Sequence, residues 1–245
     1  MSTRNNPLAE RNRPVLCYVT DRRSLSEAKP LGSVTMLAKK IEQIIAAGVD
    51  WVQIREKDLP AAELASLTRQ SLRIAANLSA KSSSPTRSFV RTLVNDRLDV
   101  AIAERAGGVH LGEKGLPVAE AKRLVNSAQR RQALDDSFLI GVSCHSLEAA
   151  QAAQRDGADY IFFGPVFATP SKAPFGAPQG TERLEQVCRS ISIPVLAIGG
   201  ITLENAPGCI HVGAAGFAAI RLLQGAHDLT NIVERLHQIT TDFRL

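Results

Sequence analysis

The segment at positions 158–172, ADYIFFGPVFATPSK, decides the fold that we expect for this chain. Its run Tyr160–Phe163 is apolar at every position, which is typical of a strand buried on both faces of a parallel sheet. The run stops at a Gly-Pro pair, and the loop TPSK at 169–172 then adds two hydroxyls and an ammonium group. An α/β barrel presents its active-site residues in this way, and these donors suit an anionic, phosphorylated ligand. For this segment alone, a solvated loop after a core strand is an equally good explanation.

Seven other segments have the composition of short buried strands, and helical patterns separate them. The strands are rich in β-branched and apolar residues and end in polar or glycine-containing loops. Between them, apolar residues recur at helical spacing, for example over 36–47 and 117–130. The other predicted strands are 15–20, 49–54, 89–94, 108–111, 138–142, 194–198 and 216–220.

An internal repeat fixes the number of strands. The sequences AGVD at 47–50, AGGV at 106–109, DGAD at 156–159 and GAAG at 213–216 each lie between a helical pattern and a strand. Each contains a glycine that can take the positive φ of a tight helix-to-strand turn. The repeat precedes every second strand, so its four copies predict eight strands. We therefore expect a single (β/α)8 TIM barrel over residues 14–245, preceded by a disordered tail at 1–13. A doubly wound open sheet is the alternative, but no GxGxxG motif follows the first strand.

The composition is that of a globular enzyme and gives no sign of a membrane or nucleic-acid partner. Hydrophobic residues make up 44% and charged residues 22% of the 245 residues, and no apolar run is long enough to span a bilayer. The net charge of +5 is scattered along the chain and only 4% of residues are aromatic, so nucleic acid is not expected. Four separated cysteines lack metal-binding spacing, which predicts reduced thiols in a cytoplasmic protein. The sequence leaves a homo-oligomer open.

The carboxyl ends of all eight strands meet at one mouth of such a barrel, so the polar residues that follow them should lie together. Arg55 and Lys57 are two positions apart after the second strand. If the strand conformation persists there, both point the same way and can bracket an oligophosphate. Asp96, after the third strand, is a hard oxygen ligand suited to Mg²⁺ on that phosphate.

A second phosphate site is predicted after the seventh strand. Gly199 and Gly200 let backbone N–H groups approach a phosphate closely, and Thr202 is expected to cap a helix whose N-terminus favours an anion. Arg221, after the eighth strand, is expected to add a second contact to this site.

Each of these features also has a purely structural explanation. A lone charged strand end is usually a solvated loop. Asp96 and Arg97 can form a local surface ion pair that contributes less than about 1 kcal/mol. His145 can be a residue at a helix start that is bonded to the backbone. Many polar strand ends at one predicted mouth favour a functional site.

Seven motifs, taken in order along the chain, resemble thiamine-phosphate synthase. The resemblance extends from about residue 15 to the C-terminus and covers a superfamily that also holds a paralogue, the thiazole tautomerase. The motifs are YVTD at 18–21, QIREK at 53–57, NDR at 95–97, HLG at 110–112, GVSCH at 141–145, GPVF with TPSK at 164–172, and AIGGI at 197–201.

The resemblance implies a Mg²⁺-dependent transfer between two small phosphorylated substrates. The aminopyrimidine methyl group leaves its pyrophosphate and bonds to the nitrogen of hydroxyethylthiazole phosphate, which gives thiamine phosphate and pyrophosphate. By motif position, Asp96 is the Mg²⁺ ligand. Lys57, Ser143 and Lys172 are the residues implied in catalysis. The implied pyrimidine pyrophosphate ligands are Gln53, Arg55, Lys57, Asn95, Ser143 and Lys172. The implied thiazole phosphate ligands are Thr169, Ser171, Gly199 and Gly200.

The chain departs from the family pattern after HLG. The family continues with Gln, a variable residue and an Asp that is the second Mg²⁺ carboxylate, whereas this chain has Glu113, Lys114 and Gly115. Glu113 is therefore the predicted second metal ligand. Two other functions remain open, namely a tautomerase-like isomerase with His145 as acid-base and a non-catalytic barrel that binds thiamine-type phosphates. The retained pyrophosphate-binding residues favour the synthase.

Overall fold

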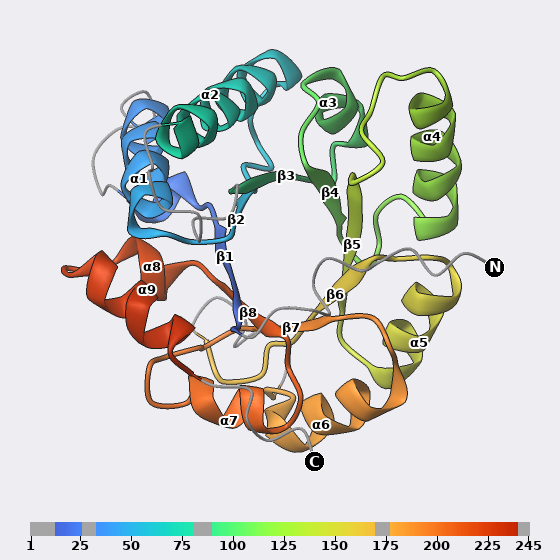
Figure 1. Ribbon diagram of the computed structural model, residues 1–245. Helices are drawn as coiled ribbons and strands as arrows, with labels where there is room; N and C mark the ends of the chain where they lie inside the picture. Colours follow the sequence, from blue (N-terminus) through green and yellow to red (C-terminus); the bar gives the residue numbers. More distant parts are fainter. Residues whose placement is uncertain (1–12, 26–32, 81–89, 170–176, 240–245) are drawn as a thin grey trace.

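The computed structural model describes residues 13–25, 33–80, 90–169 and 177–239. Within these ranges, eight parallel strands form a closed barrel in which each strand pairs with the next along the chain and β8 pairs with β1. The helices surround this barrel (Figure 1). The predicted single (β/α)8 TIM barrel is thus confirmed. The strands are β1 Val15–Val19, β2 Trp51–Ile54, β3 Arg91–Asn95, β4 Gly108–Leu111, β5 Leu139–Cys144, β6 Tyr160–Phe163, β7 Val195–Ile198 and β8 Gly216–Ala219.

The helices follow the strands in the expected alternation. Two short helices, η1 and α8, come directly after β1 and β8. None of the described helices has the length and apolar character needed to cross a membrane. The helices are η1 Arg22–Ser24, α1 Ser33–Ala47, α2 Ala61–Ala80, α3 Leu98–Ala103, α4 Val118–Arg130, α5 Leu147–Arg155, α6 Gly180–Ser190, α7 Ala206–His211, α8 Arg221–Gln224 and α9 Leu229–His237.

Apolar side chains fill both faces of the barrel wall, which explains the continuous apolar runs in the sequence. Alternate residues point outward into a core shared with the helices, and the others point into the barrel. The inner cluster stacks residues from all strands except β4. Its members are Val15, Cys17, Val19, Trp51, Leu93, Leu139, Tyr160, Phe162, Leu196 and Ala218.

Three of the four repeated turns contain the predicted left-handed glycine. Gly48, Gly157 and Gly213 have φ values of 101°, 91° and 105°. The prediction is wrong for the turn before β4, where Arg105 takes the positive φ of 52°. A glycine is required at Gly108 for a different reason, because a Cβ there would lie 2.4 Å from the carbonyl oxygen of Leu139.

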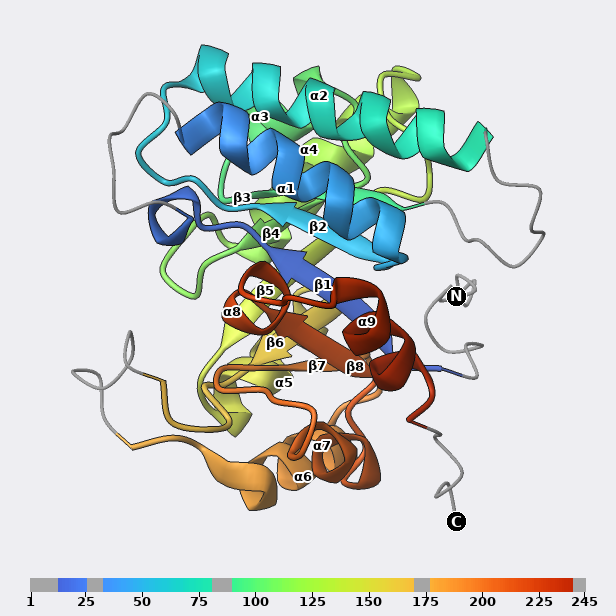
Figure 2. The same ribbon diagram turned by 90° about the vertical axis from the view of Figure 1, so that its left-hand side faces the viewer.

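One buried carboxylate connects both ends of the described chain at the bottom of the barrel. Asp50, just before β2, accepts a hydrogen bond from the amide of Leu16 at 2.9 Å and forms an ion pair with Arg13 at 2.8 Å. His237, the last residue of α9, places Nε2 3.2 Å from the same carboxylate, and α9 lies beside β1 (Figure 2). Arg13, the last residue of the predicted tail, is therefore anchored, while positions 1–12 lie outside the described residues.

Candidate active site

A chain of hydrogen bonds connects three neighbouring strand ends at the mouth of the barrel. Gln53 on β2 donates from Nε2 to Oδ1 of Asn95 on β3 at 2.8 Å, and Asn95 donates from Nδ2 to Asp96 at 2.7 Å. The amide of Gly112, after β4, donates to the other carboxylate oxygen of Asp96 at 2.6 Å. Three residues that sequence motifs placed in one site are therefore in direct contact.

Two features of this hydrogen-bonded set indicate that a ligand binds there. The Oε1 atom of Gln53 is buried and has no hydrogen-bond partner among the described residues, so it offers an acceptor to a bound molecule. Asp96 has a φ of 59°, a conformation that is costly for a residue with a side chain and that clusters at functional sites. The local ion pair considered as an alternative is absent in the described structure, because Arg97 binds Asp99 at 2.5 Å instead.

Arg55 and Lys57 follow β2, but the prediction that continued strand conformation aligns their side chains is wrong. The strand ends at Ile54, so the two side chains do not share a face by strand geometry. Arg55 is half-buried and Lys57 is exposed. Their backbone is held by the surrounding structure rather than by the sheet.

The residue between the two cations provides this support. Glu56 is only 5% exposed, and its carboxylate accepts from the hydroxyl of Thr20 at 2.6 Å and from the guanidinium of Arg22 at 2.9 Å. The hydroxyl of Thr20 in turn accepts from the amide of Arg55 at 2.8 Å. The ends of β1 and β2 are thereby tied together beneath the two cations.

Ser143 is the last inward-facing residue of β5, which continues to Cys144, beyond the predicted strand end at 142. Its hydroxyl lies 3.0 Å from Nε2 of His110 on β4, and Nδ1 of His110 lies 3.1 Å from the hydroxyl of Tyr160 on β6. Burial, together with the positive charge of Arg55, lowers the pKa of His110 to about 3, so the imidazole is neutral. His110 lies in the HLG motif and Tyr160 in the predicted strand 160–163, but no role was predicted for either. The only signal was a polar residue at an inward position of a buried strand.

The loop after β4 places the predicted second metal ligand beside a histidine. The carboxylate of Glu113 lies 3.7 Å from Nε2 of His145. Nδ1 of His145 forms a hydrogen bond with the carbonyl oxygen of Gly164. This is the backbone contact that the structural explanation of His145 predicted. Gly115 instead lies against Asp96, since a Cβ at this glycine would be 3.2 Å from Oδ1 of Asp96. Among the described residues, no three His, Cys, Asp or Glu side chains gather into a metal site.

The double glycine after β7 has the conformation expected of a close backbone approach. Gly199 and Gly200 have φ values of 96° and 66°, and a Cβ on Gly200 would lie 2.7 Å from Phe167. The prediction that Thr202 caps a helix is wrong. Helix α7 begins at Ala206, because Thr202 and Asn205 first form a reciprocal hydrogen-bonded turn. No helix N-terminus therefore follows the double glycine directly.

The remaining predicted residues are placed only in part. Thr169 is half-buried and is the last described residue of its loop, so Ser171 and Lys172 lie outside the described residues. Arg221 is exposed and begins α8 rather than extending β8.

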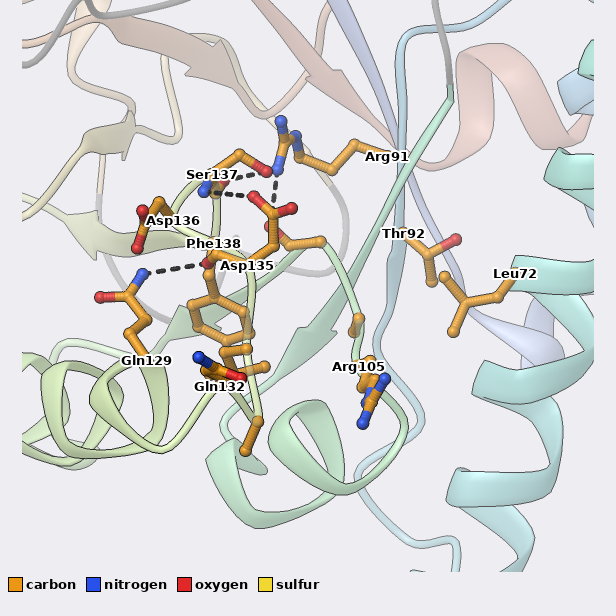
Figure 3. A pocket seen from close by; sticks show the side chains of 14 residues that line it. Leu72, Arg91, Thr92, Arg105, Gln129, Gln132, Asp135, Asp136, Ser137 and Phe138 are labelled. Carbon is orange, nitrogen blue, oxygen red and sulfur yellow. Dashed lines mark hydrogen bonds between the residues drawn. The ribbon is translucent and has the colours of Figure 1, made fainter.

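One cavity among the described residues lies at the opposite end of the barrel. It has a volume of about 680 Å³ and is bounded by the segments that lead into β3, β4 and β5. Arg91 lines this cavity and donates to the carbonyls of Gly107 and Ser137 at 2.9 and 2.7 Å, and its guanidinium lies beside Ser137 in Figure 3. A second cavity of about 530 Å³ between α3 and α4 touches Asp96 at its edge. The cavity at the opposite end contains none of the predicted site residues. The barrel mouth, where Gln53, Asn95 and Asp96 are in contact, is therefore the candidate active site.

Comparison with known proteins gives a consistent result. The sequence model of a family described as thiamine monophosphate synthase matches residues 16–223. A protein named putative thiamine-phosphate synthase from Geobacter sulfurreducens is 46% identical over 74% of this chain and 76% of its own length. Thiamine-phosphate synthase from Moorella thermoacetica is 35% identical over 87% of this chain and 93% of its own. Among solved structures, thiamine phosphate pyrophosphorylase from Pyrococcus furiosus superimposes with a TM-score of 0.74 at 29% identity, covering 96% of this chain and 98% of that one.

Proposed function

The chain belongs to the thiamine monophosphate synthase family, and from this we propose that it joins 4-amino-2-methyl-5-hydroxymethylpyrimidine pyrophosphate to hydroxyethylthiazole phosphate. The products are thiamine phosphate and pyrophosphate, so the enzyme is a transferase. The observation that carries this proposal is the connected set Gln53, Asn95 and Asp96, with Arg55 and Lys57 on the adjoining loop. A tautomerase-like isomerase is not favoured, because it has no use for a pyrophosphate site.

The reaction requires one bond to break and another to form at the pyrimidine's exocyclic carbon. The carbon–oxygen bond ionises and its electron pair leaves with the pyrophosphate; the thiazole nitrogen then donates its lone pair to the resulting cation. Negative charge grows on the leaving group in this step. We propose that Arg55, Lys57 and Lys172 stabilise that charge, and that Ser143 donates a hydrogen bond to the same group. Fixed cations contribute most where water is excluded.

Mg²⁺ is the proposed cofactor, and the residues present fit it. Mg²⁺ is commonly held by one or two carboxylates together with substrate phosphates. Asp96 supplies one carboxylate at the mouth, already oriented by Asn95 and Gly112. Glu113 stays the predicted second ligand, although it faces His145 in this structure. When bound, Mg²⁺ neutralises charge on the pyrophosphate and improves it as a leaving group.

The second substrate fits the opposite side of the mouth. No hydrogen bond joins the amides of Gly199 and Gly200 to another described backbone carbonyl, so these amides can donate to the phosphate of hydroxyethylthiazole phosphate. Thr169, Ser171 and Arg221 are the further ligands that we propose for this phosphate.

A cytoplasmic location is also proposed. All four cysteines are free, and three of them are buried, whereas Cys188 is half-buried. Burial raises the pKa of Cys144, Cys188 and Cys209 to about 12, which keeps these thiols protonated and unreactive.

The decisive experiment incubates the purified chain with both substrates and Mg²⁺ and measures thiamine phosphate by chromatography. Product should form only when both substrates are present, should stop with EDTA and should return with added Mg²⁺. Asp96→Asn should raise the Mg²⁺ concentration needed for half-maximal rate. Conversion of the carboxythiazole phosphate isomer without formation of thiamine phosphate would instead establish the isomerase.

A further inference from the structure

Three polar side chains on neighbouring strands form a continuous chain from the barrel interior to the mouth. Tyr160 on β6 is fully buried, His110 on β4 is 1% exposed, and Ser143 on β5 is half-buried. The two distances that join them are 3.1 Å and 3.0 Å. The ring of Phe162 packs against the His110 ring, with 4.0 Å between the two centroids, and restricts the plane of the imidazole.

The direction of these hydrogen bonds follows from the buried end. The hydroxyl hydrogen of Tyr160 has one acceptor within reach in the described structure, namely Nδ1 of His110. Because an unpaired hydroxyl in a buried position is costly, Tyr160 donates and Nδ1 accepts. The hydrogen of a neutral imidazole must then reside on Nε2, which donates to the oxygen of Ser143. The hydrogen of Ser143 is left for a ligand at the mouth.

The alternative direction is disfavoured at both ends. With the hydrogen on Nδ1, Tyr160 would accept, and its own hydrogen would have no described partner inside the barrel. Nε2 would then take the hydrogen of Ser143, leaving a lone pair of that oxygen facing the mouth. An oxygen lone pair repels a phosphate oxygen, whereas an O–H group binds it.

The backbone is adapted to hold Tyr160 in this position. A Cβ on Gly141 would lie 2.0 Å from the Cζ atom of the Tyr160 ring. Gly141 is two residues before Ser143 on the same strand, so one strand both makes room for the tyrosine and carries the serine.

We propose that Tyr160 and His110 are positioning residues that set the direction of the hydrogen-bond chain, so that Ser143 presents a donor to the leaving pyrophosphate. This inference deepens the proposed function and rests on it for the identity of the ligand. It also assigns His110 no proton transfer, because its Nε2 already carries a hydrogen toward Ser143 and its Nδ1 is occupied by Tyr160.

The first test reads the tautomer directly. Nitrogen-15 NMR of the full chain labelled in histidine distinguishes hydrogen on Nε2 from hydrogen on Nδ1, with His110→Gln used to assign the signal. The wild type should show His110 with hydrogen on Nε2, and Tyr160→Phe should give a mixture of both tautomers. Hydrogen on Nδ1 in the wild type would overturn the proposal. This measurement needs no turnover, so it stands apart from the test of the synthase activity.

The second test measures binding of inorganic pyrophosphate in the presence of Mg²⁺ by titration calorimetry. Ser143→Ala should weaken binding about tenfold, since one directed donor is lost. Tyr160→Phe should weaken binding only in proportion to the fraction of His110 that has lost the Nε2 hydrogen, about twofold for an equal mixture. The double variant should be no weaker than Ser143→Ala alone, because Tyr160 acts only through the serine. Additive losses in the double variant would show that Tyr160 acts by another route and would overturn the proposal.

Tyr18→Phe is the matched control for lost packing and lost stability. Tyr18 is equally buried and its hydroxyl donates to Gln224 at 2.7 Å, with no connection to Ser143. Removal of the Tyr18 hydroxyl should lower the midpoint of thermal unfolding without changing pyrophosphate affinity. If Tyr18→Phe and Tyr160→Phe lose equal pyrophosphate affinity, the loss reflects general destabilisation, which would contradict the positioning role of Tyr160.

Discussion

The hydroxyl of Thr20 lies 2.6 Å from the carboxylate of Glu56, and both side chains are buried between the ends of β1 and β2. The same hydroxyl holds the amide of Arg55 at 2.8 Å. The loop that carries the two proposed pyrophosphate-binding cations is thus fixed from below by a carboxylate that does not itself face the substrate.

Glu56→Gln should therefore damage pyrimidine pyrophosphate binding. The neutral amide keeps an acceptor for Thr20 but loses the ion pair with Arg22, so kcat/KM for this substrate should fall about tenfold, the value of one charge-assisted hydrogen bond. KM for hydroxyethylthiazole phosphate should not change. Asp58→Asn is the control, because Asp58 binds the same arginine at 2.5 Å from an exposed position. Equal effects of the two variants would refute the role given to Glu56.

Lys57→Ala should reduce turnover of the pyrimidine pyrophosphate far more than affinity for the thiazole phosphate. Loss of one cation that faces the leaving group should lower kcat about a hundredfold. Steady-state kinetics with each substrate varied in turn measures the difference. Lys39→Ala, on the exposed face of α1, serves as the control for lost surface charge. Equal losses for both substrates would place Lys57 elsewhere.

Gly115→Asp should restore a second carboxylate beside Asp96. The Cβ would lie 3.2 Å from Oδ1 of Asp96 and 3.0 Å from the carbonyl oxygen of Gly112, so the loop must shift by a few tenths of an ångström. The added negative charge should lower the Mg²⁺ concentration for half-maximal rate several-fold and tighten Mg²⁺ binding by calorimetry. Gly115→Asn has the same size without the charge. If both variants require the same Mg²⁺ concentration as the wild type, the proposed metal position is wrong.

Acid should destabilise the folded protein through His110. Its pKa is about 3 in the folded state and about 6.5 in an unfolded chain. Between these values the unfolded chain binds a proton that the folded chain does not, so stability falls as pH decreases from about 6.5 toward 3. This one group contributes a slope of about 1.4 kcal/mol per pH unit within that window. Urea unfolding at several pH values should show a shallower dependence for His110→Gln, and identical slopes would contradict the depressed pKa.

Gly141→Ala should destabilise the barrel strongly, because the new methyl group overlaps the Tyr160 ring. Overpacking of this kind costs at least about 1–3 kcal/mol. Gly208→Ala is the matched control: it lies in α7, where a Cβ would meet nothing within 4 Å. That change should be neutral or stabilise the helix by up to about 1 kcal/mol. Urea unfolding of both variants measures the contrast, and a tolerated alanine at position 141 would show that Tyr160 can move.

The barrel and the mouth were predictable because both depend on local patterns. Apolar runs such as Tyr160–Phe163, separated by helical spacing and glycine turns, predict strand number, and strand number predicts which loops meet. The chain from Gln53 to Asn95 and Asp96 joins motifs that were expected at one site, and the structure places them in contact.

What the sequence did not predict depends on contacts between strands. The partnership of Tyr160, His110 and Ser143 requires the register of β4, β5 and β6, which no local pattern contains. The contact of Glu113 with His145 at 3.7 Å likewise depends on side chains from different loops. The turn that delays α7 beyond Thr202 depends on side-chain hydrogen bonds between Thr202 and Asn205. The strand argument for Arg55 and Lys57 failed because β2 ends at Ile54.

The carboxylate of Asp50, which binds His237 across 187 positions of sequence, has a consequence for the order of folding. During synthesis, β1 and β2 leave the ribosome long before β8 and α9, so one edge of β1 has no partner until the end of the chain appears. Contacts this distant in sequence close slowly and leave strand edges exposed to aggregation in the meantime. The buried carboxylate beside β1 therefore gains its His237 contact, and the barrel its last strand pair, only after the C-terminal part of the chain has been made.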